Sequence, residues 1–231
     1  MIKKRVIVLS LGGSLIIPEE IQVGYLKKFK EVVLKNTKNY KFVIVCGGGS
    51  IARKYISALR EIGTNEELQS FVGISTTRTN ARFMSYFFGI NQRYGIAHTM
   101  RKLKQYIKKQ DIVFCGALEY KPDQTSDSTS AQVAKKLKTS FINLTNVAGL
   151  YDKNPLENKD AKRISKISWN DFDILVNKLK FKPGQHFVLD QKASKIIKEN
   201  KIITYILGED VRELDNLLKN KKFKGTTIGD F

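Results

Sequence analysis

Short apolar runs recur along the chain, and longer stretches with apolar residues at helical spacing separate them. The runs are rich in β-branched residues and almost continuously apolar, which is typical of strands that are covered on both faces. They predict five strands, over residues 5–11, 41–46, 111–115, 140–145 and 202–207. Strands buried on both faces are characteristic of parallel sheets, so we expect these five to run parallel.

The stretches between the strands predict helices. Residues 21–33 and 51–59 place apolar side chains three and four positions apart, which is the period of an amphipathic helix. Further helices are predicted over residues 66–89, 99–109, 127–138, 169–179, 191–200 and 211–219. This alternation favours one α/β domain over residues 1–231, a three-layer α/β/α sandwich with a mainly parallel central sheet. Residues 151–165 carry Asn154-Pro155 and many charges, and are expected to form an exposed loop.

The composition is that of a folded protein with a strong basic excess. Apolar residues make up 42% of the chain, and 41 Lys and Arg against 22 Asp and Glu give a formal charge of +19. Such a charge attracts nucleic acid, anionic membranes or a polyanionic small substrate. The lysines are dispersed through the predicted helices, which favours solvated faces over a nucleic-acid surface, although a nucleic-acid-binding module stays an alternative. No stretch of about 18 apolar residues occurs, and a cytoplasmic location is expected.

The cysteines and histidines indicate no metal site and no catalytic pair. Cys46 and Cys115 lie inside apolar runs, where a thiol usually behaves as a small buried hydrophobe. His98 and His186 are far apart in the sequence and are interpreted as structural or exposed.

Two glycine clusters directly follow the first two predicted strands. Gly12-Gly13-Ser14 comes after the first, and Gly47-Gly48-Gly49 comes after the second and just before a helix. Glycine lets backbone N–H groups approach a phosphate closely, although a tight turn also needs glycine. Two clusters at strand ends of one sheet favour a shared phosphate-binding crevice. Neither is a Walker A loop or G-x-G-x-x-G, and Arg53 on the following helix could fork onto a bound anion.

Two polar segments are further candidates. Asp127, within Thr125-Ser126-Asp127, starts a predicted helix, and its residue type alone favours a helix cap. The segment from Thr145 to Pro155 ends a strand and carries an aromatic residue and a lysine. It could hold a base and phosphates, or it could be a solvent loop.

In combination, these motifs resemble the amino acid kinase family over nearly the whole chain. The order strand-GGS, GGGSIAR, TSD before a helix and TNVAGLYDKNP carries the resemblance, and LDQKASKII and FKGTTIG add to it. Within the family the chain looks most like the UMP kinases of the archaeal type. The resemblance implies an amino-acid-kinase-like sandwich that transfers the γ-phosphoryl group of ATP to UMP, with acceptor in the N-terminal half and ATP in the C-terminal half.

The resemblance also implies site residues and partners. It assigns catalysis to Asp127, Arg53 and Lys153. It assigns ATP binding to Gly12, Gly13, Ser14, Thr145, Asn146, Tyr151, Asp152, Lys153 and Pro155. It assigns UMP binding to Gly47, Gly48, Gly49, Arg53, Ser70, Thr125 and Ser126. Mg²⁺ is expected to arrive with ATP rather than in a metal site of the protein's own. The expected partners are ATP, UMP and further copies of the chain, as in a hexamer, with no nucleic acid and no membrane.

Three residues depart from the family pattern. Ser10 stands where many relatives carry a lysine, Ser70 where an aspartate usually contacts the acceptor ribose, and Ala148 where TNVDG has its aspartate. Glu67, one turn from Ser70, could substitute for the missing aspartate. These departures leave two alternatives open: another small-acceptor kinase, such as an isopentenyl phosphate kinase, or a degenerate nucleotide-binding regulator.

Overall fold

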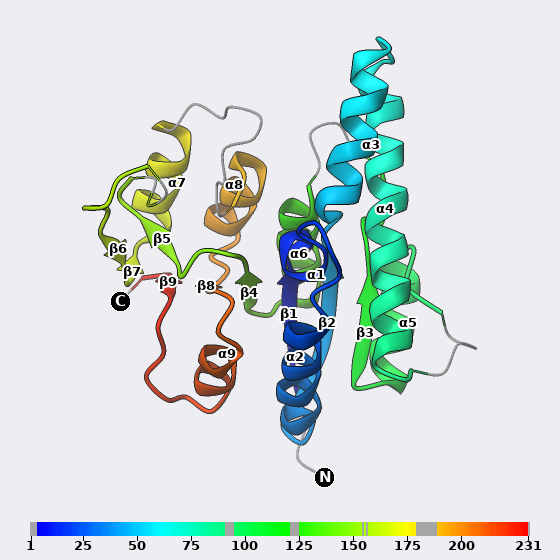
Figure 1. Cartoon of the computed structure of the whole chain (residues 1–231). Helices are drawn as coiled ribbons and strands as arrows, with labels where there is room; N and C mark the ends of the chain where they lie inside the picture. Colours follow the sequence, from blue (N-terminus) through cyan, green and yellow to red (C-terminus); the bar gives the residue numbers. More distant parts are fainter. Residues whose placement is uncertain are drawn as a thin grey trace.

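The fold is built on a seven-stranded sheet with helices on both faces (Figure 1). The computed structural model describes residues 4–90, 95–120, 125–153, 155, 157–178 and 189–230. The order of the strands in the sheet is β3-β2-β1-β4-β8-β9-β7. Their bounds are β1 Arg5–Leu11, β2 Tyr40–Cys46, β3 Ile112–Cys115, β4 Phe141–Leu144, β7 Lys166–Ile167, β8 Thr204–Leu207 and β9 Thr226–Ile228. The predicted sandwich and its mainly parallel sheet are confirmed.

The five predicted strands pair in parallel, as expected, and the one antiparallel pairing among the described residues of the main sheet involves the unpredicted β9. The pairs β1–β2, β1–β4, β2–β3, β4–β8 and β7–β9 are parallel, whereas β9 runs antiparallel to β8. All five predicted strands are present as β1, β2, β3, β4 and β8, with bounds that shift by at most two residues. Parallel strands end at the same edge of a sheet, so the segments after β1, β2 and β4 meet there.

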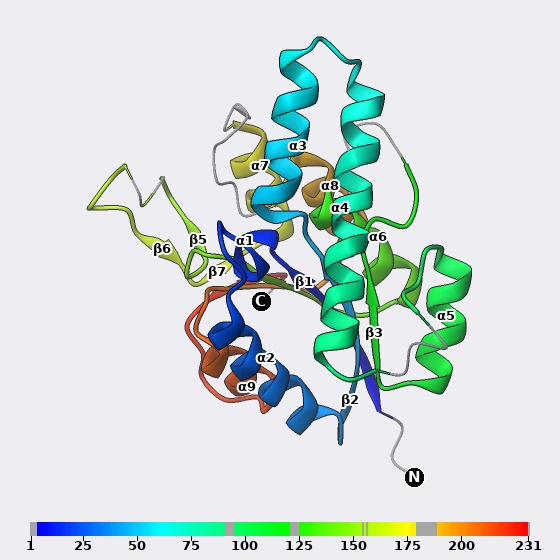
Figure 2. The same ribbon diagram turned by 45° about the vertical axis from the view of Figure 1, so that its right-hand side comes forward.

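The predicted helices are also present. Their bounds are α2 Val23–Asn36, α3 Gly49–Glu61, α4 Glu66–Phe87, α5 Met100–Lys109, α6 Ser126–Leu137, α7 Trp169–Lys178, α8 Gln191–Glu199 and α9 Val211–Leu218. In both ribbon views α3 and α4 lie side by side and project beyond the sheet (Figures 1 and 2). In the described part of the chain, no helix combines the length and apolar character needed to cross a membrane.

The core lies in two layers, one on each face of the sheet. Successive residues of β1 alternate between them: Val8 packs in one layer and Leu9 in the other. The layer of Val8 is closed by α5, α6, α7 and α8, and that of Leu9 by α2, α4 and α9. Cys46 and Cys115 are fully buried, as predicted, and burial raises the pKa of both thiols, that of Cys115 to about 12.

Several short elements were not predicted. The single loop expected over residues 151–165 was partly wrong, because a small two-stranded sheet, β5 Leu150–Tyr151 with β6 Arg163–Ile164, holds its ends together. The strands β7 and β9 and the one-turn helix α1 Gly13–Ile16 were also missed. Elements of two to four residues are too short for a period to be visible in the sequence. His98 is exposed, and His186 lies outside the described residues.

Candidate functional site

The two glycine clusters line one cavity of about 280 Å³ at the carboxyl ends of β1, β2 and β4. We call this cavity the glycine crevice. It is lined by Gly12, Gly13, Ser14, Gly47, Gly48, Gly49, Ala52, Arg53, Ser126, Asp127, Asn143, Leu144 and Thr145. Segments from four distant parts of the sequence therefore meet at one edge of the sheet, and the two glycine clusters share a crevice as predicted. Open α/β sheets bind ligands at this edge.

The glycines are required because the two turns pack backbone against backbone. A Cβ atom on Gly13 would lie 2.0 Å from the Gly49 nitrogen, and one on Gly47 would lie 2.5 Å from the Gly13 nitrogen. Gly49 also has a φ of +67°, in the left-handed region that favours glycine. The clusters therefore form tight turns, and these turns border a crevice, whereas phosphate binding there stays a prediction.

Several backbone donors border the crevice without an acceptor among the described backbone carbonyls. The N–H groups of Ser14, Gly48 and Gly49 donate to no backbone carbonyl within the described residues. Gly49 begins the 13-residue helix α3, whose amino end carries a partial positive charge. Arg53 lies in the second turn of α3 rather than the first, with an exposed side chain that borders the crevice. Such donors suit an anion such as a phosphate.

Asn80 supports the second glycine turn and was missed from the sequence. Its side-chain amide donates to the carbonyl oxygens of Gly47 at 2.8 Å and Gly48 at 3.2 Å. It lies on α4 and is buried, as are Thr76 and Thr77 one turn earlier. A buried polar stripe on a helix is the signal that could have identified it, because buried polar side chains need partners.

Asp127 lies in the first turn of α6, but the expected helix cap was wrong. Thr125 is the cap: its hydroxyl accepts hydrogen bonds from the N–H groups of Asp127 and Ser128, and the Ser128 hydroxyl completes a capping box. The Asp127 carboxylate is thus free to reach into the crevice, where it accepts a 3.1 Å hydrogen bond from the buried Ser10 hydroxyl.

The Asp127 carboxyl group has a raised pKa. Burial, and next the nearby carboxylate of Asp190, raise its pKa from 3.8 to about 7, while the Ser10 hydrogen bond acts in the opposite direction. Within the described residues no cation contributes to this balance. The Ser10 hydroxyl is therefore the hydrogen-bond partner that the described residues provide for the Asp127 carboxylate.

Asp190 is a second residue that the sequence analysis missed. It caps α8 by accepting a 2.7 Å hydrogen bond from the Ala193 N–H, and its other carboxylate oxygen accepts a hydrogen bond from the Thr125 hydroxyl. Asp190 therefore connects the starts of α6 and α8. An aspartate directly before a predicted helix is a cap signal, but its partner 65 positions away could not be read from the sequence.

The remaining expected residues do not line the glycine crevice, as far as the described residues define it. Lys153 forms an ion pair with Asp160, and Asp152 closes the β5–β6 hairpin by accepting a 2.8 Å hydrogen bond from the Lys162 N–H. Tyr151 belongs to β5, and Pro155 follows in the same hairpin, which extends away from the sheet in Figure 2.

The lining also excludes three further expected residues: Asn146, Thr125 and Ser70. Asn146 follows Thr145 directly and contacts its hydroxyl at 3.3 Å, so it stands next to the lining. Thr125 is exposed at the start of α6, one position before Ser126. Ser70 is half-buried on the projecting part of α4. The structure thus brings together the glycine turns, Arg53, Ser126, Asp127 and Thr145, and leaves the hairpin residues and Ser70 outside.

Known proteins share this arrangement over nearly the whole chain. The model of the amino acid kinase family matches residues 5–208. The uridylate kinase of Thermococcus kodakarensis is 31% identical over 224 residues, covering 96% of this chain and 98% of that protein. The uridylate kinase of Thermoplasma volcanium is 33% identical, with 96% of each covered. The crystal structure of uridylate kinase from Archaeoglobus fulgidus is 28% identical and superposes with a TM-score of 0.83 over 96% of this chain and 99% of that one.

These matches cover the part of the architecture that forms the glycine crevice. A family match over residues 5–208 includes β1 through β8, and with them every strand end that borders the crevice. The chain therefore belongs to the amino acid kinase family.

Proposed function

We propose that this protein is a UMP kinase, which transfers the γ-phosphoryl group of ATP to UMP and forms UDP. The observation that carries the proposal is the glycine crevice, where the two glycine turns, Arg53 and Asp127 meet at one edge of the sheet. The uridylate kinases of Thermococcus kodakarensis and Thermoplasma volcanium, at 31% and 33% identity over nearly the whole chain, support UMP as the acceptor. In this proposal the enzyme acts in the cytoplasm, in pyrimidine nucleotide synthesis.

The chemistry of phosphoryl transfer suits the donors of the crevice. The reaction requires two phosphates in line and charge neutralisation, far more than it requires a strong nucleophile. The N–H groups of Ser14, Gly48 and Gly49 would bind phosphate oxygens, and the Arg53 guanidinium would bind the UMP phosphate with two hydrogen bonds. Fixed donors of this kind need no rearrangement as charge builds up on the transferred group.

The carboxylates of the site suit a cation that arrives with ATP. Mg²⁺ commonly takes one or two protein carboxylates together with phosphate oxygens, and it lowers the negative charge of the phosphates. The Asp190 carboxylate raises the pKa of Asp127, and no cation among the described residues compensates for it, so these two carboxylates would be the protein's contribution to holding the ion. Within the described residues no group of three or more potential ligands suggests a separate metal site.

We further propose that the N-terminal half binds UMP and the C-terminal half binds ATP. Arg53 and the second glycine turn would hold the acceptor, and Thr145 with the hairpin residues Tyr151 and Lys153 would face ATP. The hairpin would have to approach the crevice to do so, because Lys153 pairs with Asp160 in its present position. We also propose a homo-oligomer, with a hexamer as the stoichiometry that the family resemblance suggests.

A coupled ADP-release assay tests the proposed reaction directly. Purified protein with ATP and Mg²⁺ would be offered UMP, CMP, dUMP, isopentenyl phosphate or no acceptor. We expect turnover with UMP well above every other acceptor. Turnover with isopentenyl phosphate instead of UMP would show that the protein phosphorylates a different acceptor. No turnover with any acceptor, despite thermal stabilisation by ATP, would show a nucleotide-binding protein that is not a kinase.

Arg53→Gln tests the acceptor site, and Arg60→Gln is its matched control. Both arginines are exposed on α3, but Arg53 borders the crevice and Arg60 lies in the last turn, seven positions further on. A lost charge-assisted pair costs about 1.5–3 kcal/mol, so we expect kcat/KM for UMP to fall about 10- to 100-fold in Arg53→Gln. Arg60→Gln should match the unmodified protein. Equal effects of the two changes would contradict the assigned role of Arg53.

A further inference from the structure

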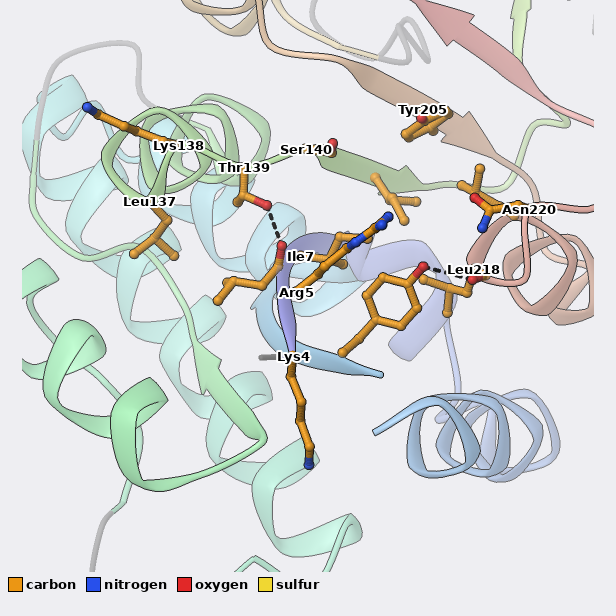
Figure 3. A pocket seen from close by; sticks show the side chains of 14 residues that line it. Lys4, Arg5, Ile7, Leu137, Lys138, Thr139, Ser140, Tyr205, Leu218 and Asn220 are labelled. Atoms are coloured by element: carbon orange, nitrogen blue, oxygen red, sulfur yellow. Dashed lines mark hydrogen bonds between the residues drawn. The ribbon is translucent and has the colours of Figure 1, made fainter. Parts of the chain in front are cut away.

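A second cavity, of about 500 Å³, opens at the opposite end of the same strands (Figure 3). We call it the amino-end cavity. The first residues of β1 and β2, Arg5 and Tyr40, line it together with Ser140 before β4, Tyr205 of β8 and Leu218 and Asn220 at the end of α9. Along β1, the lining of this cavity ends at Ile7 and the lining of the glycine crevice begins at Gly12, about 17 Å further on in an extended strand, and the two linings share no residue. The two cavities are therefore distinct sites.

The lining of the amino-end cavity is basic. It includes Lys4, Arg5 and Lys138, and no acidic residue among those described. Lys4 is engaged by Asp111 at 2.6 Å, and in Figure 3 the side chains of Lys4 and Lys138 both point away from the cavity. The Arg5 side chain instead reaches toward Tyr205 and Asn220 (Figure 3). Arg5 is thus the cation that faces the cavity.

Arg5 has an uncommitted guanidinium group. Within the described residues its side chain makes no hydrogen bond and no ion pair, although its backbone N–H donates to Asn39. A guanidinium presents parallel donors that match the two oxygens of a carboxylate or phosphate. An unpaired arginine that faces a cavity without acidic neighbours favours an anion there.

Three further polar side chains line the same cavity. The hydroxyl groups of Ser140 and Tyr205 and the side-chain amide of Asn220 make no hydrogen bond within the described residues. The Tyr205 hydroxyl is protonated at neutral pH already at its ordinary pKa of 10.0, and burial and the nearby Tyr40 raise that pKa further, so the hydroxyl is available as a donor. By contrast, the Tyr40 hydroxyl is committed to the Leu218 carbonyl at 2.8 Å.

The remaining walls are aromatic and aliphatic. Tyr40 is buried and packs near Phe42, and the ring of Tyr205 is held edge-to-face by Phe223 with centroids 6.0 Å apart. Leu218 adds aliphatic surface. Small-molecule sites usually combine a few polar groups with apolar walls in a volume of about 300–1,000 Å³, and this cavity has that composition.

We propose that the amino-end cavity binds a small organic oxyanion, a carboxylate or phosphate carried on a flat ring. The oxyanion would accept hydrogen bonds from Arg5, and the ring would lie against Tyr205 and Leu218. The proposal does not depend on the reaction at the glycine crevice, because the two cavities share no lining residue.

The test is a titration of the full chain, without a tag at its N-terminus, followed by calorimetry and by ¹H–¹⁵N NMR. The probes are phenyl phosphate, benzoate and the neutral benzyl alcohol. We expect at least one of the two anions to bind with a dissociation constant of about 1 mM or tighter, and to shift the amide signals of Tyr205 and Asn220. Benzyl alcohol should bind at least about tenfold more weakly, because it lacks the charge that Arg5 recognises.

Three variants locate the binding. Arg5→Gln should weaken the anion at least about tenfold, since a hydrogen bond to a charged group is lost. Arg101→Gln, an exposed arginine on α5, controls for net charge, and Arg53→Gln controls for binding in the glycine crevice. Both controls should retain the affinity and the shifts at Tyr205. The proposal is overturned if neither anion binds, if Arg5→Gln binds as tightly as the unmodified protein, or if Arg53→Gln alone abolishes binding.

Discussion

At the scale of single residues, Asp127 depends on a buried hydroxyl rather than a cation. Ser10 is fully buried and donates to Asp127, and Asp190 stands close enough to make a second negative charge unfavourable. The sequence suggested Asp127 as a site residue, but its environment depends on Asp190, which follows it by 63 positions. Such a pair becomes visible only when the fold brings α6 and α8 together.

The raised pKa of Asp127 predicts a pH-dependent contribution to stability. Because the folded protein holds this proton more tightly than the unfolded chain, the contribution is fully present below pH 3.8 and is lost as the pH rises through about 7. Asp127→Asn cannot lose a proton and keeps an acceptor for Ser10. Between pH 4.5 and 8 the unmodified protein should therefore lose about 1–2 kcal/mol of unfolding free energy relative to the variant, after allowance for partial exposure.

Urea unfolding at several pH values measures this difference. Asp160→Asn is the control, because Asp160 is exposed and pairs only at the surface with Lys153. Its profile should run parallel to that of the unmodified protein. If the plot of unfolding free energy against pH for Asp127→Asn also ran parallel to that of the unmodified protein, the pKa of Asp127 would not be raised by folding.

At the scale of elements, the pattern of apolar residues predicted every long helix and all five strands of four residues or more. It succeeded there because each such element buries a stripe or a face that repeats with the helix or strand period. It failed for β5, β6, β7 and β9, which are held by pairings between distant segments, such as Thr226 with Ile206. The cap of α6 was also misassigned to Asp127. Thr125 and Asp127 are both good cap residues, and only the backbone geometry shows that Thr125 is the cap.

The caps of α5 and α6 provide a matched comparison. Thr99 caps α5 through the Lys102 N–H, and Thr125 caps α6 while its hydroxyl also donates to Asp190. Thr99→Ala and Thr125→Ala should each cost about 1 kcal/mol of unfolding free energy, the usual value of such a cap. Only Thr125→Ala should also reduce UMP-dependent ADP release, because it releases Asp190 beside the crevice. Equal activity of the two variants would contradict a role of Thr125 beyond capping.

At the scale of the whole molecule, one group of exposed apolar residues lies on the two helices that project beyond the sheet. Tyr55, Ile62, Leu68 and Phe71 lie on α3, α4 and their connection with 43–75% of their surface exposed. Exposed apolar residues grouped on a projecting pair of helices are typical of a contact surface between subunits. The basic charge, dispersed over the helices, does not change that interpretation.

The proposed assembly predicts a measurable change of mass. Light scattering after gel filtration should give a multiple of the 26.3 kDa chain mass for the unmodified protein. The double change Ile62→Asp and Leu68→Asp should shift it toward smaller species, because charges would be buried in the contact. Ile174→Asp, at a similarly exposed position on α7, is the control and should leave the mass unchanged. A monomer at every concentration would exclude this assembly.

The order of the strands has a consequence for how the chain folds as it is made. β9 comes later in the chain than both of its neighbours, and within the described residues β7 joins the main sheet only through it. A nascent chain that has not yet reached Thr226 therefore presents β8 as an open edge, which favours pairing with other chains. The ribosome must release the segment after α9 before the sheet can close, so translation that stalls in that segment would expose the molecule to aggregation.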